Sequence, residues 1–95
     1  MSENKLRILY FKNDSCGVCK AFLPKIQRIS NDYGLEVEIV DIVEKPELAG
    51  QNMVFTVPTI LIMDQTGSEI KRFARNFSEL EIREFIERLL SLMNG

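Results

Sequence analysis

LRILYFKNDSCGVC, residues 6–19, is the stretch that decides the fold. Its first half belongs to a run from Lys5 to Phe11 that is mostly apolar, with β-branched and aromatic members, and this run predicts a central strand. The run stops at the polar cluster of residues 12–15. Cys16 and Cys19 follow that cluster directly. The carboxyl end of the predicted strand therefore points at the two cysteines.

A helix is expected behind the cysteines. Asp14 or Ser15 is available as its N-cap, and Gly34 is available as a left-handed stop. Pro24 lies inside this helix, and we expect a bend there because proline removes a backbone donor and clashes with the preceding turn. Apolar residues recur at helical spacing along it, namely Ala21, Phe22, Leu23, Ile26 and Ile29.

The middle of the chain predicts one strand and one short helix. Apolar and acidic residues alternate from Leu35 and give way to an apolar run that ends at Val43, as in a strand entering a covered sheet. Pro46 suits the first turn of a short helix that extends to about Gln51, because its missing N–H would have no intrahelical partner.

The last third predicts a hairpin and a second long helix. Residues 59–63 and 69–74 are the strands of the hairpin, and residues 64–67 are its turn. Ser78 and Glu81 stand at capping-box spacing, and Phe77 can pack on Ile82 as a hydrophobic staple. An apolar stripe then continues to Met93 and predicts a helix that packs on the core.

The predicted order is β-α-β-α-β-β-α. A β-α-β unit needs a parallel crossover, normally right-handed, and this places the first helix on one face of a sheet. The chain is 95 residues long, with 45% hydrophobic and 27% charged residues, which is typical of one compact globular domain. We therefore expect a single α/β domain over residues 1–95 that acts as a monomer.

Charge and hydropathy exclude several classes of partner. The formal net charge is −2 with scattered Lys and Arg, so the basic stripe that drives nucleic-acid binding is missing. The longest nearly unbroken apolar run, residues 57–63, is far shorter than the ~20 residues of a membrane-spanning helix. Residues 1–5 show no pattern of a secretion signal. These features predict a cytoplasmic protein without a nucleic-acid or membrane partner.

The spacing of Cys16 and Cys19 favours a reversible disulfide. Residues three apart on a helix are neighbours, and a small adjustment lets their sulfurs bond. The helix start exposes Cys16 to unpaired N–H groups and to the positive end of the helix dipole, which stabilise a thiolate. Cys16 is therefore the predicted nucleophile. Cys19, one turn further on, is the predicted resolving thiol that attacks the mixed disulfide.

A C-x-x-C pair has other interpretations, namely half of a zinc site or a structural bridge. The chain has two cysteines and no histidine, so four zinc ligands of the usual kind cannot be assembled. We expect no metal and no cofactor. The position of the pair, after a strand and at the opening of a helix, favours redox chemistry.

These features resemble the thioredoxin family: Tyr10-Phe11 at the strand end, the segment Cys16–Lys20, Pro24, and Thr56-Val57-Pro58-Thr59 before the third strand. The resemblance implies a four-stranded mixed sheet flanked by helices, with Pro58 in the cis form beside the sulfurs. It also implies that the backbone of Val57 pairs with an extended substrate. Gly17, Val18, Val57 and Pro58 then become candidate substrate contacts. Disulfide-containing proteins and an upstream disulfide reductase become the expected partners.

The chain also departs from the family pattern. The leading strand and helix are not present, and the tryptophan usual before the first cysteine is Ser15. Tyr10 stands where the family often keeps a buried aspartate, so the proton acceptor for Cys19 is unassigned. Ile39 stands at the position of its accompanying lysine. Arg75 replaces a glycine after the fourth strand and puts a cation near the expected substrate surface.

We expect a thiol-disulfide oxidoreductase that exchanges protein disulfides. One alternative is a non-catalytic redox sensor or interaction module of the same fold, which Arg75 and the missing aspartate favour slightly. Another is a glutathione-dependent enzyme similar to glutaredoxins, suggested by the short amino terminus and by residues 56–58. The Gly-Gly and acidic pair with which that family grips glutathione is not found beside the fourth strand.

Overall fold

The computed structural model describes residues 6–94. Lys5, where the predicted first strand begins, lies outside the described residues, and so does the amino-terminal stretch on which the expectation about a secretion signal rests. Within residues 6–94, no helix is long and apolar enough to cross a membrane.

Seven elements follow one another in the predicted order, and the α/β class is confirmed. They are β1 (Arg7–Lys12), α1 (Gly17–Tyr33), β2 (Glu36–Asp41), α2 (Pro46–Gln51), β3 (Thr59–Met63), β4 (Glu69–Ala74) and α3 (Glu79–Asn94). The four strands form one sheet in the order β2-β1-β3-β4. β1 pairs in parallel with β2 and antiparallel with β3, and β3 pairs antiparallel with β4. This is the mixed sheet of the thioredoxin fold.

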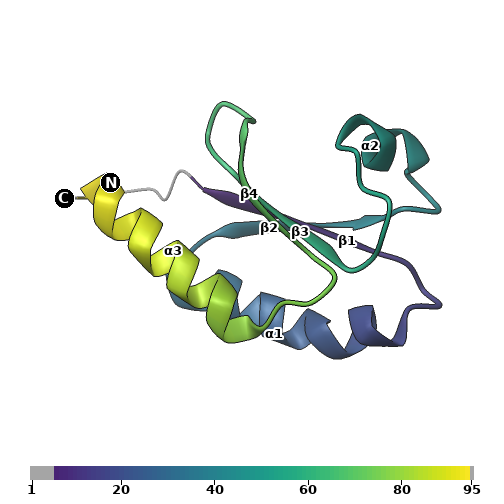
Figure 1. The fold of residues 1–95 in the computed structure, drawn as a ribbon, viewed down its shortest axis with the longest axis horizontal. Helices are drawn as coiled ribbons and strands as arrows, with labels where there is room; N and C mark the ends of the chain where they lie inside the picture. The colour runs from purple at the N-terminus through teal and green to yellow at the C-terminus, as the bar shows by residue number, and fades with distance from the viewer. Residues whose placement is uncertain (1–5, 95) are drawn as a thin grey trace.

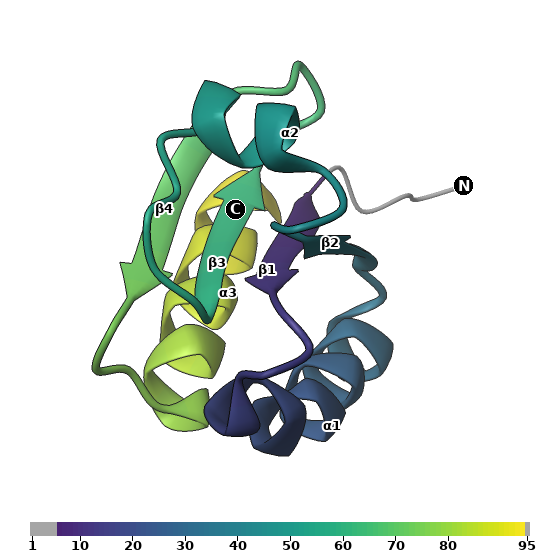
Figure 2. The same ribbon diagram turned by 90° about the vertical axis from the view of Figure 1, so that its right-hand side faces the viewer.

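Helices cover both faces of the sheet, as Figures 1 and 2 show: α1 and α3 lie on one face, and α2 lies on the other. Alternate strand residues belong to the hydrophobic cores on the two faces of the sheet, because successive side chains of a strand point to opposite faces. Ile8 of β1 packs with Ile26 of α1 and Ile86 of α3 on the first face. Leu9 of β1 packs with Leu61 of β3 and Ala49 of α2 on the second face. β1 is therefore buried on both sides and carries the site at its carboxyl end.

Several predicted boundaries differ from the structure by one or more residues, and side-chain hydrogen bonds explain two of the differences. β2 ends at Asp41 rather than Val43, because the Asp41 carboxylate accepts hydrogen bonds from the backbone N–H groups of Val43 and Glu44 and turns the chain. The N-cap of α1 is Cys16, not Asp14 or Ser15. Asn13 accepts from the backbone and hydroxyl of Ser15 and forms a turn before the helix starts.

The helix ends agree with the sequence patterns. Gly34 closes α1 in the left-handed conformation, with φ of 66°. Ahead of α3, the Ser78 hydroxyl accepts from the backbone N–H of Glu81 at 3.1 Å, and the Glu81 carboxylate accepts from the backbone N–H of Ser78 at 2.8 Å. This is the predicted capping box. α1 continues through Pro24, and the bend expected there stays a prediction.

Candidate functional site

Cys16 and Cys19 lie at the amino end of α1, and their sulfurs are joined in a disulfide. Their Cα atoms are 5.2 Å apart, within the range that disulfide geometry allows. The structure therefore holds the oxidised form of the pair that the spacing predicts. Among the described residues, neither cysteine is free.

The two sulfurs differ in their surroundings. Cys16 is half-buried, whereas Cys19 is buried with 2% of its surface exposed. The Cys16 sulfur caps α1 by accepting a hydrogen bond from the backbone N–H of Cys19 at 3.0 Å. Unpaired N–H groups and the dipole at a helix start stabilise negative charge. The residue that a substrate can reach is thus also the one whose thiolate the helix would stabilise.

Tyr10 ties the centre of the sheet to the first turn of α1. Its side chain is fully buried, and its hydroxyl donates a hydrogen bond to the backbone carbonyl of Cys19 at 2.7 Å. Burial raises the pKa of Tyr10 to about 12. The hydroxyl therefore stays protonated at neutral pH. In this form it donates to the turn that carries Cys19, and it cannot act as a base.

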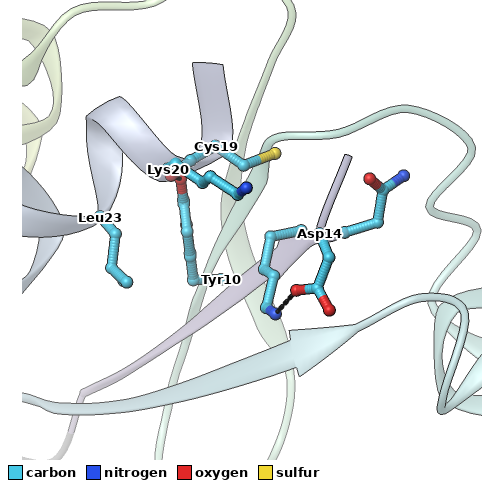
Figure 3. Close-up of a pocket in the computed structure, with 7 residues that line it drawn as sticks. Tyr10, Asp14, Cys19, Lys20 and Leu23 are labelled. Carbon is cyan, nitrogen blue, oxygen red and sulfur yellow. Dashed lines mark hydrogen bonds and ion pairs between the residues drawn. The ribbon is translucent and has the colours of Figure 1, made fainter. Parts of the chain in front are cut away.

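A hollow of 230 Å³ lies beside the buried cysteine (Figure 3). It is lined by Tyr10, Lys12, Asn13, Asp14, Cys19, Lys20 and Leu23. The Lys12 ammonium donates to the carboxylates of Asp14 at 2.8 Å and Asp41 at 3.3 Å. The hydrogen bond to Asp14 and the one to Asp41 keep the pKa of Lys12 above its usual value. Charged groups thus line the hollow beside Cys19, and the buried residue on its wall is Tyr10 rather than an acid.

Asp41 is held ionised from several directions. The backbone N–H of Val43, then that of Glu44 and the Lys12 ammonium, keep the pKa of the Asp41 carboxyl below its usual value. Within residues 6–94, no group of three Cys, Asp or Glu side chains is arranged to hold a metal ion. The charges around Lys12 therefore form an ion-pair cluster at the end of β1 and β2.

The segment before β3 forms the other side of the site. The Val57–Pro58 peptide bond is cis, as the family resemblance implies. Pro58 is buried, Val57 is half-buried, and the Thr59 hydroxyl donates to the carbonyl of Thr56 at 2.7 Å. Figures 1 and 2 both place the start of β3 at the end of the sheet that faces the amino end of α1.

The other predicted contact residues lie on the surface. Gly17 and Arg75 are exposed, and Val18 is 65% exposed. Arg75 has φ of 67°, in the left-handed region, which explains why a glycine suits its position. Sequence reasoning did not single out Phe55, which is 82% exposed in the segment that leads to Val57. The available signal was an aromatic residue placed between the predicted short helix and the third predicted strand.

Comparisons with known proteins agree with this geometry. The thioredoxin family model matches residues 1–88. The chain is similar to the solved structure of thioredoxin 1 from Thermosipho africanus, with 52% identity, a TM-score of 0.90, and coverage of 94% of this chain and 99% of that one. It is also similar to the thioredoxin-like protein YdfQ of Bacillus subtilis, which is 26% identical over 100% of this chain and 85% of that protein. The bifunctional thioredoxin reductase/thioredoxin of Mycobacterium leprae is 31% identical over 76% of this chain and 16% of that protein.

Proposed function

This chain belongs to the thioredoxin family and is a protein-disulfide oxidoreductase with a redox-active Cys16–Cys19 pair, and on that premise we propose that Cys16 attacks and Cys19 resolves. The single observation that carries the assignment is the asymmetry of the pair. Cys16 is half-buried and caps the helix, whereas Cys19 is 2% exposed. An attacking sulfur has to meet a substrate, and a resolving sulfur has to meet only its partner.

The reaction begins from the dithiol form. The Cys16 thiolate attacks one sulfur of a substrate disulfide, that disulfide breaks, and its other sulfur leaves as a thiolate that takes a proton from solvent. Cys19 then loses its proton and attacks the Cys16 sulfur of the mixed disulfide. The second substrate sulfur leaves, and the Cys16–Cys19 disulfide remains. Two electrons pass from the cysteine pair to the substrate, so a reductase has to return them.

Substrates dock, in this proposal, as extended polypeptide segments beside the sulfurs. The backbone of Val57, next to the buried Pro58, adds the substrate as an extra strand. Val18 and Val57 supply an apolar rim around the pair, and Gly17 leaves room above the helix start. The exposed Arg75 side chain favours acidic substrate segments. Support comes from the exposure of Gly17, Val18 and Arg75 and the partial exposure of Val57.

The finer assignments follow from the same premise. Disulfide-containing proteins are the substrates, and an upstream disulfide reductase regenerates the dithiol. The Mycobacterium leprae relative, whose name joins a thioredoxin reductase to a thioredoxin, supports a reductase partner for this chain. Residues 1–95 act as one domain and as a monomer in the cytoplasm.

Substitution of each cysteine tests the proposed roles of attack by Cys16 and resolution by Cys19. Cys16→Ser should reduce insulin no faster than dithiothreitol alone, because the attacking sulfur is gone. Cys19→Ser should still attack but stall, because nothing releases the substrate, and it should accumulate a mixed disulfide that mass spectrometry detects. The Cys16 thiol should titrate below the ordinary value of about 8.5 when thiolate absorbance is followed against pH.

Two outcomes would contradict the assignment. Full turnover by Cys16→Ser would remove Cys16 from the reaction. A mixed disulfide trapped by Cys16→Ser rather than by Cys19→Ser would reverse the two roles. Turnover supported by glutathione but not by dithiothreitol would point to the glutaredoxin-like alternative.

A further inference from the structure

Arg72 makes a dense set of contacts away from the cysteine pair. It lies in β4 opposite Leu61 of β3, on the face of the sheet that α2 covers. Its guanidinium donates to the backbone carbonyls of Asn52 at 2.7 Å and Met53 at 3.0 Å. The same guanidinium donates twice to the Glu69 carboxylate, each time at 2.8 Å. One side chain thus joins the edge strand to the segment that follows α2.

That segment, residues 52–58, connects α2 to β3 and ends at the cis proline. Its first part is anchored to α2, since the backbone N–H of Val54 donates to Ala49 and that of Met53 donates to Gly50. Met53 has φ of 54°, a conformation that a residue with a side chain rarely adopts. The Arg72 contacts fall on the carbonyls at this bend. They therefore fix the direction in which the chain leaves α2.

Exposed and buried residues follow one another along this segment. Met53 is 60% exposed and Phe55 is 82% exposed, whereas Val54 between them is buried in the core under α2. An exposed segment that must receive a substrate strand binds best when it is already ordered, because ordering it on binding costs free energy. The conformation at Asn52 and Met53 sets the start of the path that leads to Val57.

We propose that Arg72 is a positioning residue, which holds residues 52–58 in the conformation to which a disulfide-bearing polypeptide docks. The proposal rests on the proposed function, in which the Val57 backbone receives the substrate. Arg72 contacts neither sulfur in any described interaction, and it acts on docking rather than on thiol exchange. A small disulfide, which needs no added strand, should react with Cys16 whether or not Arg72 is present.

The planar guanidinium suits this role better than an ammonium does. It can donate to two neighbouring carbonyls while its other edge stays paired with a carboxylate, which a single lysine nitrogen cannot do in the same geometry. Glu69 orients the guanidinium from the same strand. Arg72 is half-buried, so part of its aliphatic stem is removed from solvent. A test must therefore keep the stem while removing the donors.

The test measures, by rapid mixing, the second-order rate constants with which the pre-reduced protein reacts with two disulfide substrates. Arg72→Met keeps an unbranched apolar stem, and Arg88→Met makes the same change on the exposed face of α3 as the matched control. With insulin, Arg72→Met should lower the second-order rate constant about tenfold, because the hydrogen bonds to the carbonyls of Asn52 and Met53 are lost. With 2-hydroxyethyl disulfide its rate constant should stay within about twofold of the wild-type value. Arg88→Met should change neither.

Arg72→Lys is a second variant for the same two rate measurements if Arg72→Met does not fold. It retains charge and stem, and its rate constant with insulin should also fall while the small disulfide reacts normally. Equal losses with both disulfides would overturn the proposal, because the effect would then lie in the chemistry or the whole fold. Unchanged rates with insulin would overturn it as well. A wild-type protein that reduces neither disulfide would instead refute the proposed function.

Discussion

At the scale of single residues, Arg75 occupies a backbone conformation that its side chain does not favour. It follows β4 with φ of 67° and is exposed. The left-handed region costs a residue with a Cβ atom about 1–2 kcal/mol, part of which glycine returns through its greater freedom in the unfolded chain. Arg75→Gly should therefore raise the free energy of unfolding by up to about 1 kcal/mol. Urea denaturation measures the change.

The control for this prediction is Arg75→Ala, which removes the charge but keeps the Cβ atom. It should give no gain in the free energy of unfolding. If alanine stabilises the protein as much as glycine does, the cause lies in the charge, and the backbone explanation is wrong.

Residue contacts mark the limit of what the sequence predicts. The disulfide between Cys16 and Cys19 was predictable from their spacing after a strand, but the partners of Arg72 lie 19 and 20 residues earlier in the chain. An arginine in an alternating strand is typical of a solvent-facing position, so nothing local indicates that it binds two carbonyls. Tyr10 is a similar case. The sequence marks it as a departure from an aspartate, and only the fold brings its hydroxyl to the carbonyl of Cys19.

At the scale of elements, the capping box of α3 is a local device with a measurable effect. The Ser78 hydroxyl and the Glu81 carboxylate satisfy two backbone N–H groups that the helix leaves unpaired. Ser78→Ala should lower the free energy of unfolding by about 1 kcal/mol. Thermal and urea unfolding measure the loss, and disulfide reduction should be unchanged because the hydrogen bonds of Ser78 are made to Glu81 and Ile82 of α3.

Ser91 offers the matched control, since it is exposed near the other end of the same helix. Ser91→Ala should leave stability unchanged or raise it slightly, because alanine is the better helix former. A similar loss for both variants would show that the capping hydrogen bond is not the cause.

Element order was predictable because each strand and helix carries a local signal, namely an apolar pattern, a run of strand-forming residues or a proline at the helix start. The predicted end of β2 and the predicted cap of α1 were wrong for the same physical reason, which is that short polar side chains competed with the regular pattern. Asp41 accepts two backbone N–H groups and ends β2 although apolar residues continue. Asn13 uses its side chain for a turn, and this leaves the cap of α1 to the Cys16 sulfur. The site itself thus depends on a turn that periodicity does not reveal.

At the scale of the whole molecule, charge and burial set how stability depends on pH. The pKa of Asp41 is lowered, chiefly by backbone hydrogen bonds, and that of Asp64 is lowered, chiefly by the Thr66 hydroxyl. The pKa of Glu69 is lowered by Arg72. A lowered folded-state pKa stabilises the protein above the unfolded value of about 4, and this contribution is lost as pH falls through the folded pKa. Stability should therefore decline below about pH 4.

The alkaline side has the opposite sign and a different cause. Burial raises the pKa of Tyr10 to about 12, and its unfolded value is about 10. The unfolded chain releases this proton first, so stability should fall as pH rises from about 10 towards the folded value. Urea unfolding of the oxidised protein measures the profile without a contribution from free thiols.

Tyr10→Phe should lower stability at neutral pH, because the hydrogen bond to Cys19 is lost, but should flatten the alkaline decline. Asp64→Asn is the control, and it should leave the alkaline loss of stability intact while weakening the acid loss. If the alkaline loss of stability persists in Tyr10→Phe, another group such as Lys12 causes it.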